Sequence, residues 1–222
     1  MNIRDHILFE KDGILVLDKP AGLPSTGRNL EDPNCAQFLL MQATRRRVWA
    51  VHQLDAQTSG VNVFVRRKGL VDTLSLAMRQ RGEKRYVAVC AGVLSADQII
   101  EEPVGWDEER RAHGVVQGGQ AAKSEVHVLA TSSSASLLEV RIFTGRSHQI
   151  RLHLTHIGHP LLGDARYAPP EVAQRHARTA LHAASLEVPP YFALRAPLPD
   201  DLCRLAEREG LAVPDYLRRC GA

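Results

Sequence analysis

The chain has few cysteines, and no pattern joins them. Its four cysteines, Cys35, Cys90, Cys203 and Cys220, stand apart without a CxxC pair. This spacing indicates neither a zinc site nor a disulfide framework. Long apolar runs are also missing: no window approaches the roughly 20 apolar residues of a membrane span, and the first ten residues lack the apolar segment of a signal peptide. We therefore expect a cytoplasmic protein.

Common cofactor motifs are absent as well. The sequence contains no P-loop, no GxGxxG after a predicted strand and no zinc-deaminase signature. Four histidines lie close together at His148, His153, His156 and His159. They form no HExxH motif, and Asp164 is the one acidic ligand near them, so we expect satisfied core or surface histidines and no metal site.

The length and composition that remain are those of an ordinary globular protein. The chain has 222 residues, of which 44% are apolar and 24% charged, enough for one sizeable core. We expect a single catalytic domain over residues 1–222. Strands are predicted at 13–17, 48–51, 60–65, 85–90, 125–129, 137–143 and 181–188, and helices at 70–80, at 147–157 and after an Asp32 cap and Pro33. Strands without regular βαβ repetition favour an α+β fold with a mixed, largely antiparallel sheet and flanking helices.

The net charge of +3 is small, but its distribution is uneven. Residues 44–68 carry six basic side chains, Arg45, Arg46, Arg47, Arg66, Arg67 and Lys68, and a single acid, Asp55. Such a segment suits a polyanionic substrate, because Lys and Arg neutralise phosphates and release counterions. The alternative is a solvated charged face.

The densest candidate for chemistry is the loop His52–Ser59, between two predicted strands. Its one carboxylate, Asp55, sits among small hydroxyl residues just before Gly60. Asp55 could be a nucleophile or a general base. It could also be a turn aspartate that accepts hydrogen bonds from its own backbone.

A second candidate is the segment Thr144–Arg151, a turn that enters a helix. The free N–H groups at a helix start bind anions, and Arg146 adds positive charge. Arg151 lies beside the apolar stripe and could pair with a carboxylate and keep it ionised. The simpler interpretation is an amphipathic core helix.

The third candidate is Lys84-Arg85-Tyr86 at the start of a strand. An aromatic between cations can stack on an unpaired base. Tyr86 could equally be a half-buried strand residue.

Six segments in order resemble the RluA-like pseudouridine synthases. They are LDKPAGLPS, HQLDAQTSG, KRYVAV, TGRSHQIRLHLTHIGHPLLGDARY, LHAASLEV and APLP, and they extend over about residues 10–202. The resemblance implies the pseudouridine synthase fold with a central catalytic cleft, and cofactor-independent isomerisation of a uridine in RNA. By motif position, it implies that Asp55 is the nucleophile, that Tyr86 packs on the target base and that Arg151 pairs with the aspartate. The RNA-binding residues expected around them are His52, Gln53, Thr58, Lys84, Arg85, Arg146, His148 and Gln149.

One departure concerns Gln53. The family usually has HRLD where this sequence has HQLD, so a guanidinium expected near the flipped nucleotide is absent. Gln can hydrogen-bond a base or sugar but supplies no charge. We hypothesise that an arginine from Arg45 to Arg47 compensates.

The resemblance begins near residue 10, so we expect no N-terminal S4-type RNA-binding domain. The partner is then a compact rRNA or tRNA stem-loop, recognised mainly by shape and a splayed base. We expect a monomer without protein partners. The alternative function is a non-catalytic RNA-binding protein that retains the fold, and a metal-dependent hydrolase built on the histidines ranks third.

Overall fold

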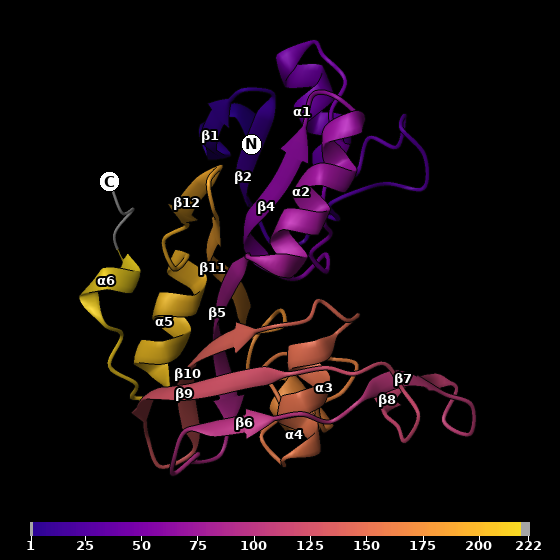
Figure 1. The fold of residues 1–222 in the computed structure, drawn as a ribbon. Helices are drawn as coiled ribbons and strands as arrows, with labels where there is room; N and C mark the ends of the chain where they lie inside the picture. Colours follow the sequence, from indigo (N-terminus) through magenta and orange to yellow (C-terminus); the bar gives the residue numbers. More distant parts are fainter. Residues whose placement is uncertain (1, 219–222) are drawn as a thin grey trace. The chain divides into compact units, whose positions relative to one another are not determined.

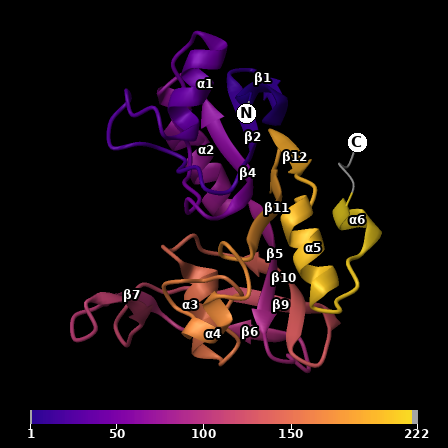
Figure 2. The same ribbon diagram turned by 180° about the vertical axis from the view of Figure 1, so that it is seen from behind.

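A computed structural model describes residues 2–218. Within them the chain forms two compact units. Unit 1 contains residues 2–83 and 183–197, and unit 2 contains residues 84–182 and 198–218. Both units combine antiparallel strands with helices (Figures 1 and 2). This confirms the predicted α+β class, whereas the expectation of a single domain over the whole chain stays a prediction.

Unit 1 is built on a short antiparallel sheet. Its elements are the 3-10 helix Ile3–His6, β1 (Ile7–Lys11), β2 (Ile14–Lys19), α1 (Ala36–Thr44), β3 (Trp49–Ala50), β4 (Ser59–Val65), α2 (Gly69–Gln80), most of β11 (Leu181–Val188) and β12 (Phe192–Arg195). β2 pairs with β1 on one side and with β4 on the other, and β3 continues the pairing with the end of β4.

The two faces of this sheet are covered by different helices. Ile14 and Val16 pack in one cluster with Leu74 and Met78 of α2. Leu15 and Leu17, the alternate residues of β2, pack in another cluster with Leu40 of α1. Because successive strand residues point to opposite faces, the uninterrupted apolar run of β2 indicates a strand buried on both sides.

The start of α1 differs from the prediction. The helix begins at Ala36 with Cys35 as its N-cap, and the Cys35 Sγ accepts a hydrogen bond from Phe38 N at 3.4 Å. Asp32 instead accepts hydrogen bonds from the backbone N–H groups of Arg28 and Asn34, both at 3.1 Å. The expected cap was wrong because this aspartate closes the preceding turn.

The main strands of unit 2 pair in the order β5-β10-β9-β6, and the pairs β5–β10, β10–β9 and β9–β6 are antiparallel. Its elements are β5 (Glu83–Ala91), β6 (Gln98–Ile100), β7 (Val104–Asp107), β8 (Ala112–Val115), β9 (Ser124–Thr131), β10 (Ala135–Ile142), α3 (Gln149–His156), α4 (Pro170–Ala173), α5 (Asp200–Arg208) and α6 (Asp215–Arg218). Ile150 and Leu154 of α3 share a core cluster with Leu138 and Val140 of β10. β7 and β8 form a separate hairpin that projects away from this sheet (Figures 1 and 2).

Three cysteines can be placed in the structure. Cys35, Cys90 and Cys203 are free thiols, and burial raises the pKa of Cys90 to about 12. Cys220 lies outside the described residues. None of the described helices is both long and apolar enough to cross a bilayer.

Candidate active site

The loop that carries Asp55 connects β3 to β4 in unit 1. Val51 N donates to Val63 O at 2.9 Å and so prolongs the β3–β4 pairing. His52 is held twice: its carbonyl accepts from Asn62 Nδ2 at 3.1 Å, and its Nε2 accepts from Val63 N at 3.2 Å. The last two contacts fix where the loop begins.

A buried lysine supports the loop from inside. Lys19, at the end of β2, is fully buried, and its Nζ donates to the carbonyls of Pro20, Leu23 and Ala56 at 3.0, 2.7 and 3.3 Å. Gly22 N also donates to Ala56 O, at 2.8 Å. Since Ala56 follows Asp55 directly, the turn Lys19–Leu23 and the Asp55 loop share one cation.

The residue before Asp55 is anchored as well. Ser25, 2% exposed, accepts from Leu54 N at 2.9 Å and donates to Leu54 O at 3.3 Å through its hydroxyl. Thr58 N closes the loop by donating to Asp55 O at 3.0 Å. The backbone is thus fixed on both sides of a half-buried aspartate, which is the preorganisation that a reacting group requires.

Gly60 explains the small residue that ends the loop motif. Its φ is 107°, and a Cβ there would lie 2.2 Å from Ala183 O of β11. The backbones of β4 and β11 approach so closely that only glycine fits. The end of the loop is therefore held at a close backbone contact with β11.

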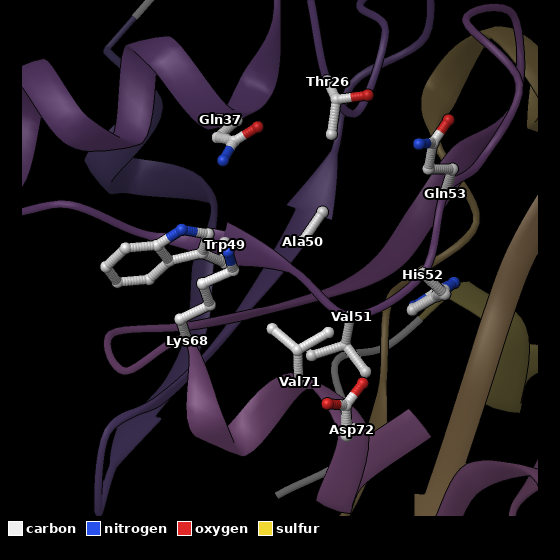
Figure 3. Close-up of a pocket in the computed structure, with 10 residues that line it drawn as sticks. All are labelled: Thr26, Gln37, Trp49, Ala50, Val51, His52, Gln53, Lys68, Val71 and Asp72. Atoms are coloured by element: carbon white, nitrogen blue, oxygen red, sulfur yellow. The ribbon is translucent and has the colours of Figure 1, made fainter. Parts of the chain in front are cut away.

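Gln53 and His52 line a cavity of about 340 Å³ beside the loop (Figure 3). The other lining residues are Thr26, Gln37, Trp49, Ala50, Val51, Lys68, Val71 and Asp72. Gln53 is exposed. Its amide can donate and accept hydrogen bonds at the mouth of this cavity.

The expected compensation for Gln53 is not supported. Arg46 and Arg47 precede β3, and Trp49 pairs with Val65 at the far end of β4. The chain then runs back along β4 to reach Gln53 beyond Val51. Arg46 and Arg47 line a different cavity from the one that Gln53 lines.

In unit 2, Arg151 on α3 forms a buried ion pair with Asp164. Its Nε donates to Asp164 Oδ2 at 2.7 Å and its Nη2 to Asp164 Oδ1 at 2.8 Å. The two side chains are 10% and 1% exposed. Asp164 Oδ1 also accepts from the backbone N–H groups of Arg166 and Tyr167. This bidentate arrangement fixes the plane of the guanidinium.

An aromatic ring covers the same arginine. The Arg151 guanidinium lies 4.8 Å from the centroid of the Tyr167 ring. The Tyr167 hydroxyl is 2.5 Å from Nδ1 of His148, the left-handed residue that precedes α3. His113 and Trp106 of the β7–β8 hairpin extend this row of edge-to-face rings. Trp106 is 48% exposed at the end of the row.

Gln149 has a structural task that the sequence did not reveal. It is 3% exposed, and its Nε2 donates to Lys123 O and Ser124 Oγ at 2.9 and 3.0 Å. Its Oε1 accepts from Thr144 Oγ1 at 2.7 Å and from Arg146 N at 3.2 Å. Gln149 therefore shapes the turn Thr144–His148, and these contacts favour a positioning role.

The other predicted residues of unit 2 lie on β5 and at the turn before α3. Tyr86 pairs with Val140 of β10 and packs against the core cluster that contains Ile150. Arg85 is paired with Glu139 at 2.5 Å. Lys84 is the second residue of the same strand. Arg146 is exposed, and its Nε donates to Ala121 O at 3.1 Å.

The clustered histidines have separate partners. His153 is buried, and its ring nitrogens lie 2.9 Å from Ser124 Oγ and 2.9 Å from Glu102 O. Burial lowers the pKa of His153. His159 bonds Ala91 O. Among residues 2–218, no group of three His, Cys, Asp or Glu side chains is placed to hold a metal ion.

Four residues that support these sites lie in the family-like segments, but the sequence alone assigned them no role in the sites: Lys19, Ser25, Asp164 and Tyr167. The sequence offers a signal for Lys19, because a lysine inside an apolar strand that ends in Pro-Ala-Gly must find carbonyl partners when buried. Asp164 follows Gly163, whose φ is 74°. Sequence spacing does not indicate which arginine this aspartate would meet.

Comparison with known proteins identifies the family. Residues 13–156 match the family model described as RNA pseudouridylate synthase. The chain is 36% identical over 220 residues to the ribosomal large subunit pseudouridine synthase D of Nitrosomonas europaea, and the match covers 90% of this chain and 64% of that one. It is 33% identical over 187 residues to the dual-specificity RNA pseudouridine synthase RluA of Escherichia coli, covering 82% and 85%.

A solved structure shows the same fold. The human RNA pseudouridylate synthase domain containing 4 superposes with a TM-score of 0.78 at 22% identity, over 96% of both chains. The chain thus belongs to the RNA pseudouridylate synthases, a family of isomerases, and the resemblance in the sequence is confirmed. It spans 64% of the length of the Nitrosomonas relative.

Proposed function

We propose that this chain isomerises a uridine in structured RNA to pseudouridine, with Asp55 as the nucleophile and without a cofactor. The chain belongs to the family, and hydrogen bonds from Lys19, Ser25 and Asn62 hold its Asp55 loop around a half-buried carboxylate. This observation supports the proposal most directly. A fixed carboxylate loses little freedom on reaching the transition state.

The reaction exchanges one bond to the ribose for another. The bond between C1′ and N1 of uracil breaks, the detached base turns, and C1′ bonds to C5. The C5 proton is released and N1 takes one up, so no atoms are gained or lost. Asp55 either attacks C1′ or assists loss of the base through a glycal-like intermediate, and an attack on C6 of uracil is a third scheme.

The other residues hold the substrate. Tyr86 packs on the target base, and Arg151, oriented by Asp164 and Tyr167, pairs with the nucleophile. The backbone and edges of the RNA are held by Gln53, Lys84, Arg85, Arg146 and His148, while His52, Thr58 and Gln149 shape the two loops. A base drawn out of its stack suits such a site.

The RNA is a stem-loop of rRNA or tRNA. One relative is named as a ribosomal large subunit synthase, which supports an rRNA target, and another is named as a dual-specificity RNA synthase, which supports more than one class of RNA. A monomer and a cytoplasmic location remain predictions.

The test is release of tritium from RNA labelled at C5 of uridine, because this hydrogen leaves when C1′ bonds to C5. Purified wild-type protein should release tritium from total RNA, and Asp55→Asn should lower the rate by at least about 10⁴-fold, as loss of a nucleophile does. The matched control is Glu31→Gln, an exposed carboxylate of unit 1, which should behave like wild type.

Mapping of pseudouridine by mass spectrometry after cyanoethylation would then locate the modified site. If wild type modifies no uridine in total RNA yet binds RNA, the non-catalytic alternative replaces this proposal. Full activity of Asp55→Asn would remove Asp55 from the mechanism.

A further inference from the structure

A second cavity of unit 1 is lined mainly by cationic side chains. Its volume is about 620 Å³, and its lining residues are Glu10, Lys11, Asp12, Gly13, Arg46, Arg47, Arg66 and Arg67. These include five basic and two acidic side chains. We call it the arginine groove.

Three chain segments meet to form the arginine groove. Arg66 and Arg67 follow the last residue of β4, and Arg66 N donates to Gly13 O at the β1–β2 turn, at 2.8 Å. Arg45, with a φ of 53°, ends α1 and leads into Arg46 and Arg47. The β3–β4 pairing then holds this segment beside β4. The groove is therefore a product of the sheet and not of one flexible loop.

Most of its positive charge is not neutralised within the protein. Arg66 is paired with Glu10, and its Nη1 donates to Thr44 Oγ1 at 3.2 Å. In the part of the chain that the structure describes, no ion pair involves Arg46, Arg47 or Arg67, and all three are exposed. Like charges held together repel one another, and a bound polyanion relieves that repulsion.

The groove is separate from the Asp55 loop. The loop precedes Ser59 and the groove follows Val65, so the two lie at opposite ends of β4. A strand of seven residues spans about 20 Å. The uridine that meets Asp55 therefore cannot occupy the groove.

We propose that the arginine groove binds the sugar-phosphate backbone of a second segment of the RNA substrate, away from the uridine that is modified. This rests on the proposed function, because the occupant is the same RNA. Guanidinium groups match phosphate oxygens in a bidentate fashion. Binding at two places on one RNA raises the effective concentration of the target at the catalytic loop.

An acidic protein is the competing occupant, and the geometry favours RNA over it. Exposed guanidinium groups contributed by separate segments along a groove fit a regular row of phosphates. They need no particular base sequence, since phosphate contacts position a nucleic acid without reading it.

The binding test uses a fluorescein-labelled RNA hairpin without uridine, which carries phosphates but no reactive base. Anisotropy titrations between about 50 and 200 mM KCl give the salt slope. The variant is Arg46→Gln, Arg47→Gln, Arg67→Gln. Its matched control is Arg79→Gln, Arg81→Gln, Arg195→Gln, three exposed arginines of unit 1 outside the groove.

For the groove variant, the plot of log K (the association constant) against log salt should be less steep than for wild type by about 2. Its affinity should fall by on the order of tenfold, as expected for three lost phosphate contacts. The control variant should show less than half of this change in the slope and in the affinity. Equal losses in both variants, or no loss in either, would overturn the proposal. If the triple variant does not fold, single Gln variants replace it, each lowering the slope by about 0.7.

Two further arms separate the possible explanations. If polyglutamate displaces the hairpin as well as unlabelled RNA does at equal charge concentration, the groove selects acidic polymers in general and the RNA proposal falls.

With tritium-labelled total RNA, the groove variant should raise the half-saturating RNA concentration and leave the saturated single-turnover rate unchanged. A wild type without tritium release would refute the proposed function, while hairpin binding would still decide the role of the groove.

Discussion

Each of the two units supports its candidate site residues through a buried cation, but in a different way. In unit 1 the charge of Lys19 is spread over three backbone carbonyls. In unit 2 the charge of Arg151 meets one carboxylate, Asp164, in a bidentate pair. Carbonyl partners fix the path of a loop, whereas a carboxylate partner fixes the plane of the cation itself. The same element, a buried cation, therefore positions a backbone in one unit and a side chain in the other.

The largest effect is expected from Asp164→Ala. The change leaves Arg151 without its buried counter-ion and removes the acceptor of two backbone N–H groups. Loss of one partner of a buried pair costs about 3–5 kcal/mol in the free energy of unfolding. Urea unfolding measures it. Asp97→Ala, which removes an exposed partner of His127, serves as the control and should change little. Equal stability of the two variants would mean that the buried pair adds nothing.

A smaller loss is expected from Lys19→Met. Methionine fills a similar space but leaves the carbonyls of Pro20 and Leu23 without this donor, at a cost of about 3 kcal/mol. The Asp55 loop should shift as well, and a displacement of about 1 Å lowers turnover by on the order of 10²-fold.

Thermal unfolding and tritium release together test this role of Lys19. Lys11→Met, an exposed lysine on β1, is the control for stability. If Lys19→Met were destabilised yet fully active at saturating RNA, the lysine would support the fold without positioning Asp55.

The smallest effect is a gain in stability from Asp18→Asn. Burial raises the pKa of Asp18 to about 6, although the charges of His6 and Lys19 lower it. A carboxyl with a raised pKa in the folded state binds its proton more tightly there than in the unfolded chain. Wild type should therefore lose on the order of 2 kcal/mol as the pH rises from about 4 to about 6.

The asparagine variant lacks this titration. Its advantage in unfolding free energy should be near zero at pH 4 and fully present at pH 7. Parallel urea titrations across this range measure the difference. A constant difference at all pH values would show that the carboxyl of Asp18 does not titrate in this window.

Some elements were predictable because their signal is local. The apolar run at 13–17 and the helical spacing at 70–80 predicted β2 and α2, whose ends differ by no more than two residues. The helix α5 was missed, although Asp200 and Asp201 in its first turn and the spacing of Leu202, Leu205 and Ala206 are helical signals. Its N-cap is Pro199, which makes no side-chain cap hydrogen bond.

By itself, the sequence determined the family, the α+β class and the loop that carries Asp55, because motif order and hydrophobic period are properties of short segments. The tertiary structure alone decided which carboxylate pairs with Arg151 inside unit 2, and which carbonyls surround Lys19. It also decided that the basic segment 44–68 divides between two cavities, because Lys68 lines the one beside Gln53 while Arg46, Arg47, Arg66 and Arg67 line the arginine groove. Such partners are distant in the chain and meet only when strands pair, so their contacts depend on register and not on local spacing.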